Sequence, residues 1–100
     1  MLSILCTPVE VQSQLAQRFR TVRLTAGYKR ATLAKRAGVS EASLKRFENT
    51  GDISLKNLLR LAHALRRLQE FTSLFQPPEA ETLAELKAGA VKKKPKRGRI

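Results

Sequence analysis

The sequence predicts an all-α protein, a compact bundle of about five short helices. Three observations lead to this fold class. Apolar residues recur at spacings of three and four along residues 8–75, as on one face of a helix. Threonine, serine or glycine stands at most boundaries of these segments, where helices commonly begin or end. Only residues 1–5, MLSIL, resemble a strand, and that run is too short to form a sheet alone.

The first helix is expected between Thr7 and Gly27. Thr7 is the predicted N-cap, Pro8 suits the first helical position, and Glu10 can reach back to complete a capping box. Gly27 can end the helix. An apolar stripe follows the start at steps of four, four and three: Val11, Leu15, Phe19 and Val22.

Two short helices are predicted on either side of Gly38. The second helix runs from about Arg30 to Ala37, and the third from about Glu41 to Glu48 with Ser40 as its cap. Glycine can adopt the left-handed conformation that a sharp turn requires. The side chains expected to face the core are Leu33, Ala34 and Ala37 in the second helix and Leu44 and Phe47 in the third.

Two more helices are expected after the turn sequence NTGD at residues 49–52. Ser54 should cap the fourth helix, and residues 68–75 should form a short fifth one that ends at Pro77. Residues 81–88 could add a further loose turn or two. The predicted apolar residues are Leu55, Leu58, Leu59, Ala62 and Leu65 in the fourth helix and Leu68, Phe71, Leu74 and Phe75 in the fifth.

The charge of the chain points to a polyanionic partner. Lys and Arg number 20 against 8 Asp and Glu, which gives a net charge of +12 and favours nucleic acid over an anionic membrane or an acidic protein. Residues 92–99 hold six basic residues and no acid. The predicted organisation is an extension at 1–6, a domain at 7–76, and an acidic short helix followed by a disordered basic tail at 77–100.

Composition also indicates the cellular compartment of the protein. A single cysteine, Cys6, excludes an internal disulfide and suits a reducing cytoplasm. No apolar run reaches the ~18 residues of a membrane span, so no membrane partner is expected. The opening MLSILC lacks the basic start of a signal peptide.

The glycine turn and the two helices beside it have the form of a helix-turn-helix. Val39 is expected to fill the angle between the helices. With Leu44 and Phe47 turned inward, the outward residues of the third helix could enter a DNA major groove, which is roughly 12 Å wide. The candidate base-reading residues are Glu41, Ala42, Lys45 and Arg46.

Each candidate residue has its own chemistry. Arg46 can bond guanine through two nitrogens, and Ala42 can touch a thymine methyl group. Glu41 could accept from a cytosine amine or only stabilise the helix dipole. Phosphate contacts are expected from the hydroxyls of Ser40 and Ser43, and from Lys29 and Arg30 at the positive start of the second helix.

Residues 24–65 resemble the lambda-repressor-like, XRE-type helix-turn-helix family. The matching residues are Gly27, Leu33, Ala34, Ala37, Gly38, Val39, Ser40, Leu44, Glu48 and Asn49. The resemblance implies phosphate contacts at Arg30, Ser40, Ser43 and Asn49 and base reading at Glu41, Ala42 and Arg46. The chain departs from the family pattern at Lys29, where a Ser or Thr cap is usual, at Arg30, and by an extra Thr50.

The flanking segments are similar to HipB-like antitoxins, which are paired with HipA-type kinase toxins. That resemblance covers about residues 5–86 and implies a homodimeric, self-repressing regulator of a palindromic operator that also binds such a toxin. Two units one helical turn apart, about 34 Å, would read a palindrome. The candidate dimer or partner contacts are Phe71, Leu74 and Phe75, which could instead only cover the fourth helix. Residues 1–5 could pair as a strand with a second subunit or a toxin.

No pattern of residues indicates catalysis, a metal site or a cofactor. His63 is the only histidine and is expected at the surface, while Glu79, Glu81 and Glu85 suit a solvated helix face. The function that the resemblance implies is a bacterial, cytoplasmic DNA-binding repressor and antitoxin that associates with the nucleoid. The alternatives are a stand-alone, phage-like XRE regulator and a basic protein-interaction module with weak DNA binding. The tail at 92–99 could contact DNA, a protein partner or neither.

Overall fold

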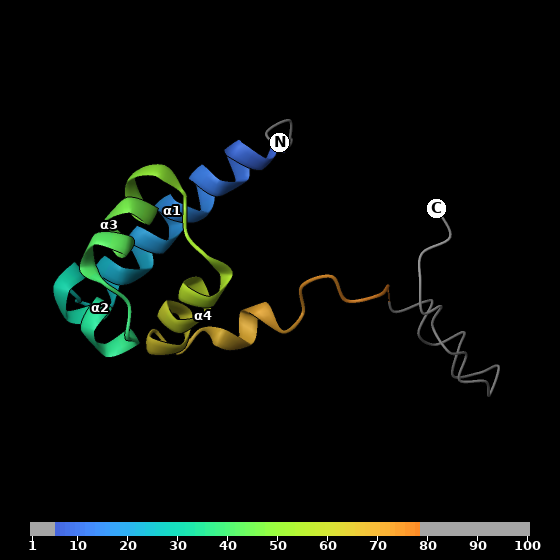
Figure 1. Cartoon of the computed structure of the whole chain (residues 1–100). Helices are drawn as coiled ribbons and strands as arrows, with labels where there is room; N and C mark the ends of the chain where they lie inside the picture. Colours follow the sequence, from blue (N-terminus) through green and yellow to red (C-terminus); the bar gives the residue numbers. More distant parts are fainter. Residues whose placement is uncertain (1–5, 79–100) are drawn as a thin grey trace.

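Residues 6–78 are described in the computed structural model of the chain, and they fold as helices joined by short turns (Figure 1). No strand occurs in this part of the chain, which confirms the all-α prediction. The strand that residues 1–5 could form, the helical turn that 81–88 could add and the basic tail lie outside the described residues. The elements are α1 (Pro8–Thr25), α2 (Arg30–Ala37), α3 (Glu41–Thr50), α4 (Leu55–Ala64) and the 3-10 helix η1 (Leu68–Phe71).

Side-chain caps begin three of the four α-helices in residues 6–78. The Thr7 hydroxyl accepts from the Glu10 amide at 3.2 Å, and the Glu10 carboxylate accepts from the Thr7 amide at 3.1 Å, so the capping box is confirmed. Ser40 and Ser54 cap α3 and α4 as predicted. Helix α2 begins at Lys29 without a side-chain cap.

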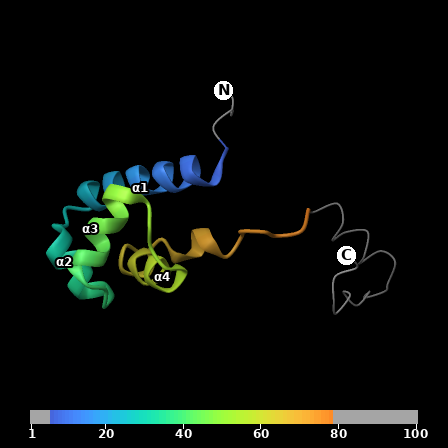
Figure 2. The same ribbon diagram turned by 45° about the horizontal axis from the view of Figure 1, so that its top comes forward.

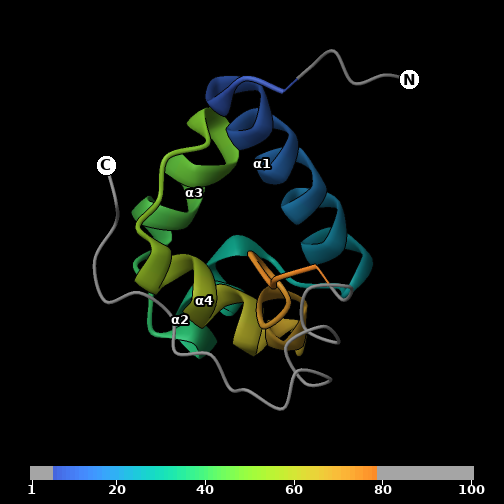
Figure 3. The ribbon, with the colours of Figure 1, turned by 90° about the vertical axis from the view of Figure 1, so that its right-hand side faces the viewer.

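The buried face of α1 agrees with the predicted stripe only in part, since Phe19 and Val22 are half-buried and Phe19 packs against the core. Val11 and Leu15 are exposed, whereas Ala16 and Arg23 are buried. The C-terminal end of α3 lies beside the first half of α1 (Figure 3), and the small side chain of Ala16 suits this close contact. Because α3 covers this face, the buried side of α1 includes Ala16 and Arg23 beside part of the predicted stripe.

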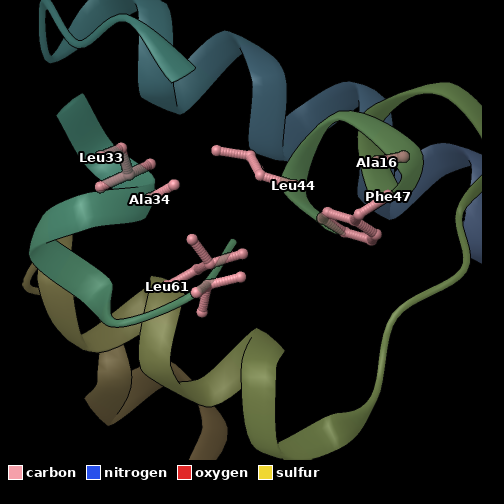
Figure 4. Packing of buried hydrophobic residues seen from close by; sticks show 7 residues of the cluster. Ala16, Leu33, Ala34, Leu44, Phe47 and Leu61 are labelled. Atoms are coloured by element: carbon pink, nitrogen blue, oxygen red, sulfur yellow. The ribbon is translucent and has the colours of Figure 1, made fainter. Parts of the chain in front are cut away.

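The core is formed where α2, α3 and α4 meet, and Ala16 of α1 adds to it. Figure 4 shows side chains from these helices converging on one another, with Ala16 beside Phe47. The Phe47 ring also makes an edge contact with Phe19, with centroids 5.4 Å apart. The largest fully buried side chains are Leu33, Leu44, Phe47 and Leu61.

Helix α4 buries only part of the predicted set: Ala62 is buried as expected, and Leu58 and Leu65 pack against the core. Leu61 is fully buried although it was not expected inside, and Leu55 is 65% exposed. The reason is that α4 packs on α2, which turns Leu61 and Ala62 inward and leaves the first residue of the helix outside. Leu58 and Leu59 are half-buried.

Helix α3 is longer than the sequence indicates. Asn49 and Thr50 were expected in a turn, but both belong to the last turn of the helix. The Thr50 hydroxyl donates to the Arg46 carbonyl at 2.7 Å, and the chain leaves the helix at Gly51, where φ is +85°. A Cβ at Gly51 would lie 3.0 Å from Gln12 Cβ, so glycine is also required here for the approach to α1.

The segment after α4 forms only part of the predicted fifth helix. The 3-10 helix η1 ends at Phe71, and residues 72–78 lead away from the four α-helices (Figures 1 and 2). A helix over 68–75 was therefore too long a prediction. Among residues 6–78, no helix has the length and apolarity needed to cross a bilayer.

Candidate nucleic-acid interface

The turn between α2 and α3 fixes the angle of a helix-turn-helix. Gly38 has φ +74° and ψ 31°, the left-handed conformation, and no atom lies within 4 Å of where its Cβ would be. Glycine is thus needed for the backbone conformation and not for space. Val39 is buried against this turn, and its amide donates to the Ala34 carbonyl at 3.0 Å.

One face of α3 is left open to solvent. Its opposite face is held in the core by Leu44 and Phe47, both almost completely buried. The structure brings the four candidate base-reading residues together on the open face, and all four are exposed: Glu41, Ala42, Lys45 and Arg46. Two of the four are cations, so this face combines positive charge with a small residue near the start of the helix.

The candidate phosphate-binding hydroxyls lie at the start of α3. The Ser40 hydroxyl accepts from the Ser43 amide at 3.0 Å and donates to the Ser43 hydroxyl at 2.8 Å. Ser40 is exposed and Ser43 is half-buried. Asn49 is exposed near the other end of the same helix.

Lys29 and Arg30 differ in their surroundings although they are adjacent. Lys29 is exposed at the uncapped start of α2, where free amide groups favour an anion. Arg30 instead donates from Nε to the Glu48 carboxylate at 3.1 Å, and its side chain is 30% exposed. In the free protein, Arg30 therefore joins α2 to α3.

A buried ion pair that sequence reasoning missed holds the inner side of this unit. Arg23 of α1 makes two hydrogen bonds to the Glu48 carboxylate, from Nε at 2.6 Å and from Nη2 at 2.9 Å. The remaining nitrogen, Nη1, donates to the Tyr28 carbonyl at 2.8 Å. The two side chains are only 5% and 1% exposed. The one available signal was spacing, since Arg23 follows Phe19 by four residues on the same helical face.

The two arginines determine the charge state of Glu48. Burial of the carboxyl group acts to raise its pKa, because a charge is unfavourable away from water. The hydrogen bonds and positive charges of Arg23 and Arg30 outweigh burial and hold the pKa of Glu48 below its ordinary 4.5. Glu48 is therefore a carboxylate at neutral pH, and it ties α3 to both α1 and the start of α2.

The three residues predicted to meet a partner lie at the end of the described chain. Phe71 is half-buried and lines an apolar groove of about 270 Å³ with Leu15, Phe19 and Leu65. Leu74 is exposed, and Phe75 is completely exposed. The three residues therefore differ in burial, because Phe71 packs on the helical bundle and the other two do not.

Residues 6–78 contain no group of three metal-ligating side chains that could hold an ion. His63, the only histidine, is exposed on α4.

The fixed turn, the capped third helix and its exposed basic face define a helix-turn-helix DNA-binding protein. A family model described as "Helix-turn-helix" matches residues 19–71, more than half of the chain. The chain thus belongs to this XRE-like family of DNA-binding regulators. No curated protein and no solved structure matches it significantly.

Proposed function

We propose that the protein is a sequence-specific transcriptional repressor that binds a palindromic operator as a homodimer. The observation that carries this proposal is the exposed face of α3, whose helix is fixed from behind by Leu44, Phe47 and the Glu48 ion pairs. A rigid helix can present its side chains to base edges without losing order on binding. In the cytoplasm of a bacterium, such a protein would reside on the nucleoid.

The proposal divides the contacts into two groups. Base edges are read by the open face of α3, through Glu41, Ala42, Lys45 and Arg46. Phosphates are held at the helix starts and at the far end of α3, through Lys29, Arg30, Ser40, Ser43 and Asn49. Arg30 would make its contact only by sharing its guanidinium between Glu48 and DNA, since its Nε already donates to that carboxylate.

Homodimer formation is assigned to the segment after α4. The exposure of Leu74 and Phe75 supports it, because two large apolar residues in one short segment gain from burial against a second copy. The groove lined by Phe71 provides an apolar surface next to this segment. Sedimentation equilibrium tests the assignment: the full chain should sediment as a dimer, and Phe75→Ser should shift it toward monomer.

The test of DNA reading is fluorescence anisotropy with the full chain. The probes are the DNA directly upstream of the protein's own coding sequence and a scrambled duplex of equal length, each at two salt concentrations. Tight binding to the upstream duplex alone supports an autoregulatory repressor. Equal, salt-sensitive binding to both duplexes would contradict it, because phosphate contacts alone do not distinguish sequences.

We further propose that the repressor is the antitoxin of a type II toxin–antitoxin operon and binds a HipA-type kinase. The support is the similarity of residues 5–86 to HipB-like antitoxins and the exposed apolar residues after η1. Size-exclusion chromatography of the full chain with a purified HipA-type kinase tests it. Co-elution supports the antitoxin role, while separate elution favours a stand-alone XRE-type regulator.

A basic protein-interaction module is the second candidate function, and the net charge of +12 favours it. Arg46→Ala separates this module from the repressor. Loss of discrimination between the two duplexes supports the repressor, whereas unchanged binding to both supports the module.

A further inference from the structure

The Arg46 side chain faces one carboxylate just beyond the end of its own helix. Arg46 Nη2 lies 3.5 Å from Asp52 Oδ2, just after α3 ends. Both side chains are well exposed, Arg46 by 69% and Asp52 by 57%. Within residues 6–78, Asp52 is the only ion-pair partner of Arg46.

Asp52 is itself fixed in place from two sides. Gln12 of α1 donates from Nε2 to Asp52 Oδ1 at 3.4 Å and to the Gly51 carbonyl at 3.2 Å. The Asp52 amide donates to the Thr50 hydroxyl at 3.1 Å, and that hydroxyl donates to the Arg46 carbonyl. The two carboxylate oxygens thus have separate partners, one on α1 and the other on α3.

Exposure decides what this ion pair can contribute. An exposed pair of charges adds little to folding, since water screens it and two long side chains must be ordered. The same pair gains strength when a bound duplex removes water from around it. The effect of Asp52 is therefore expected in the complex with DNA and not in the stability of the free protein.

We propose that Asp52 is a positioning residue that makes Arg46 selective for a base. Asp52 attracts the guanidinium to one side of α3, and at 3.5 Å the pair is long enough for the guanidinium still to make the two-point contact with guanine. The Asp52 carboxylate also disfavours a rotation of the Arg46 side chain toward a phosphate. After such a rotation Asp52 would lie near the phosphate without a positive partner. This inference rests on the proposed reading of DNA by α3.

The experiment begins with a duplex that the full-length wild-type chain selects from a random library. Affinities for this duplex and for a scrambled one are measured by anisotropy, and their ratio is the discrimination. Asp52→Asn should lower the discrimination roughly fivefold to tenfold, a part of what one good base contact provides. Its affinity for the scrambled duplex should rise about twofold, since a negative charge near the phosphates is lost.

Two further variants separate positioning from charge. Gln12→Ala keeps the charge of Asp52 but removes the hydrogen bond that fixes it, so discrimination should fall without a gain for the scrambled duplex. Glu70→Gln is the matched control, because Glu70 forms a similarly exposed pair with Arg67 at 2.6 Å. The control should leave the discrimination unchanged.

The double variant shows whether Asp52 acts through Arg46. In an Arg46→Ala background, Asp52→Asn should cause no further loss of discrimination. If Asp52→Asn keeps the wild-type discrimination while Arg46→Ala lowers it, the positioning role is wrong and DNA reading stands. If the wild-type chain enriches no sequence at all, the repressor function and this inference both fail.

Discussion

Helix α3 contributes one residue to each of two arginine–carboxylate pairs of opposite character. These residues, Arg46 and Glu48, are only two positions apart. Glu48 faces inward and is bound by Arg23, and neither side chain has more than 5% of its surface exposed. Arg46 faces outward and meets Asp52 with both side chains in water. Similar chemical groups therefore have different roles on the two faces of one helix. The inner pair holds the helix, and the outer pair is available to a ligand.

The inner pair should give the largest effect on stability. Glu48→Gln leaves the buried charge of Arg23 without its partner, which costs about 3–5 kcal/mol in the free energy of unfolding. Urea unfolding followed by circular dichroism measures this loss. Glu70→Gln, which breaks an exposed pair, should change stability by less than about 1 kcal/mol. Equal losses in both variants would remove the distinction between the pairs.

Acid should weaken the inner pair. The pKa of Glu48 is lower in the folded protein than its ordinary 4.5, so the unfolded chain binds the proton more tightly. Its contribution is complete above pH 4.5 and is lost as pH falls through the folded pKa. Wild-type unfolding free energy should therefore drop more steeply below pH 4.5 than that of Glu48→Gln. Parallel pH profiles for the two proteins would contradict this role.

The outer pair should respond in binding rather than in folding. Arg46→Ala is expected to cost about 1–3 kcal/mol for the selected duplex and to relax preference at one base position. Its unfolding free energy should stay within about 0.5 kcal/mol of wild type because the side chain is exposed. A variant that loses stability but keeps its base preference would reverse the assignment.

Arg30 is partly buried and lies between the two extremes, so its replacement should cause small effects on both stability and DNA binding. Its Nε bonds Glu48, but Arg23 would still neutralise that carboxylate if Arg30 were lost. Arg30→Gln should thus lower the unfolding free energy by about 1 kcal/mol. The slope of log affinity against log salt should also fall by about one if Arg30 binds a phosphate. An unchanged slope would restrict Arg30 to its role inside the protein.

Local sequence signals predicted the helix-turn-helix well. The bounds of α2, the left-handed turn at Gly38 and the Ser40 cap follow from residues within a few positions of one another. The exposed positions on α3 followed once Leu44 and Phe47 were assigned to the core.

Contacts between distant segments could not be predicted in the same way. The pairing of Arg23 with Glu48 spans 25 residues, and an arginine in a helix gives no local sign of its partner. The burial of Leu61 and the exposure of Leu55 depend on how α4 is rotated against α2, which the wide apolar face of α4 leaves open. The burial of Ala16 and Arg23 on α1 was missed for the same reason, since it depends on the position of α3.

The tight approach of Gly51 to Gln12 has a consequence for how such a regulator can evolve. Together with the hydrogen bond from Gln12 Nε2 to the Gly51 carbonyl, this approach fixes the end of α3, while Leu44, Phe47 and Glu48 fix the middle. Mutations at the outward positions 41, 42 and 45 can therefore accumulate with little effect on the fold. If α3 reads bases as proposed, a new operator preference is then accessible by single substitutions, without a compensating change elsewhere in the chain.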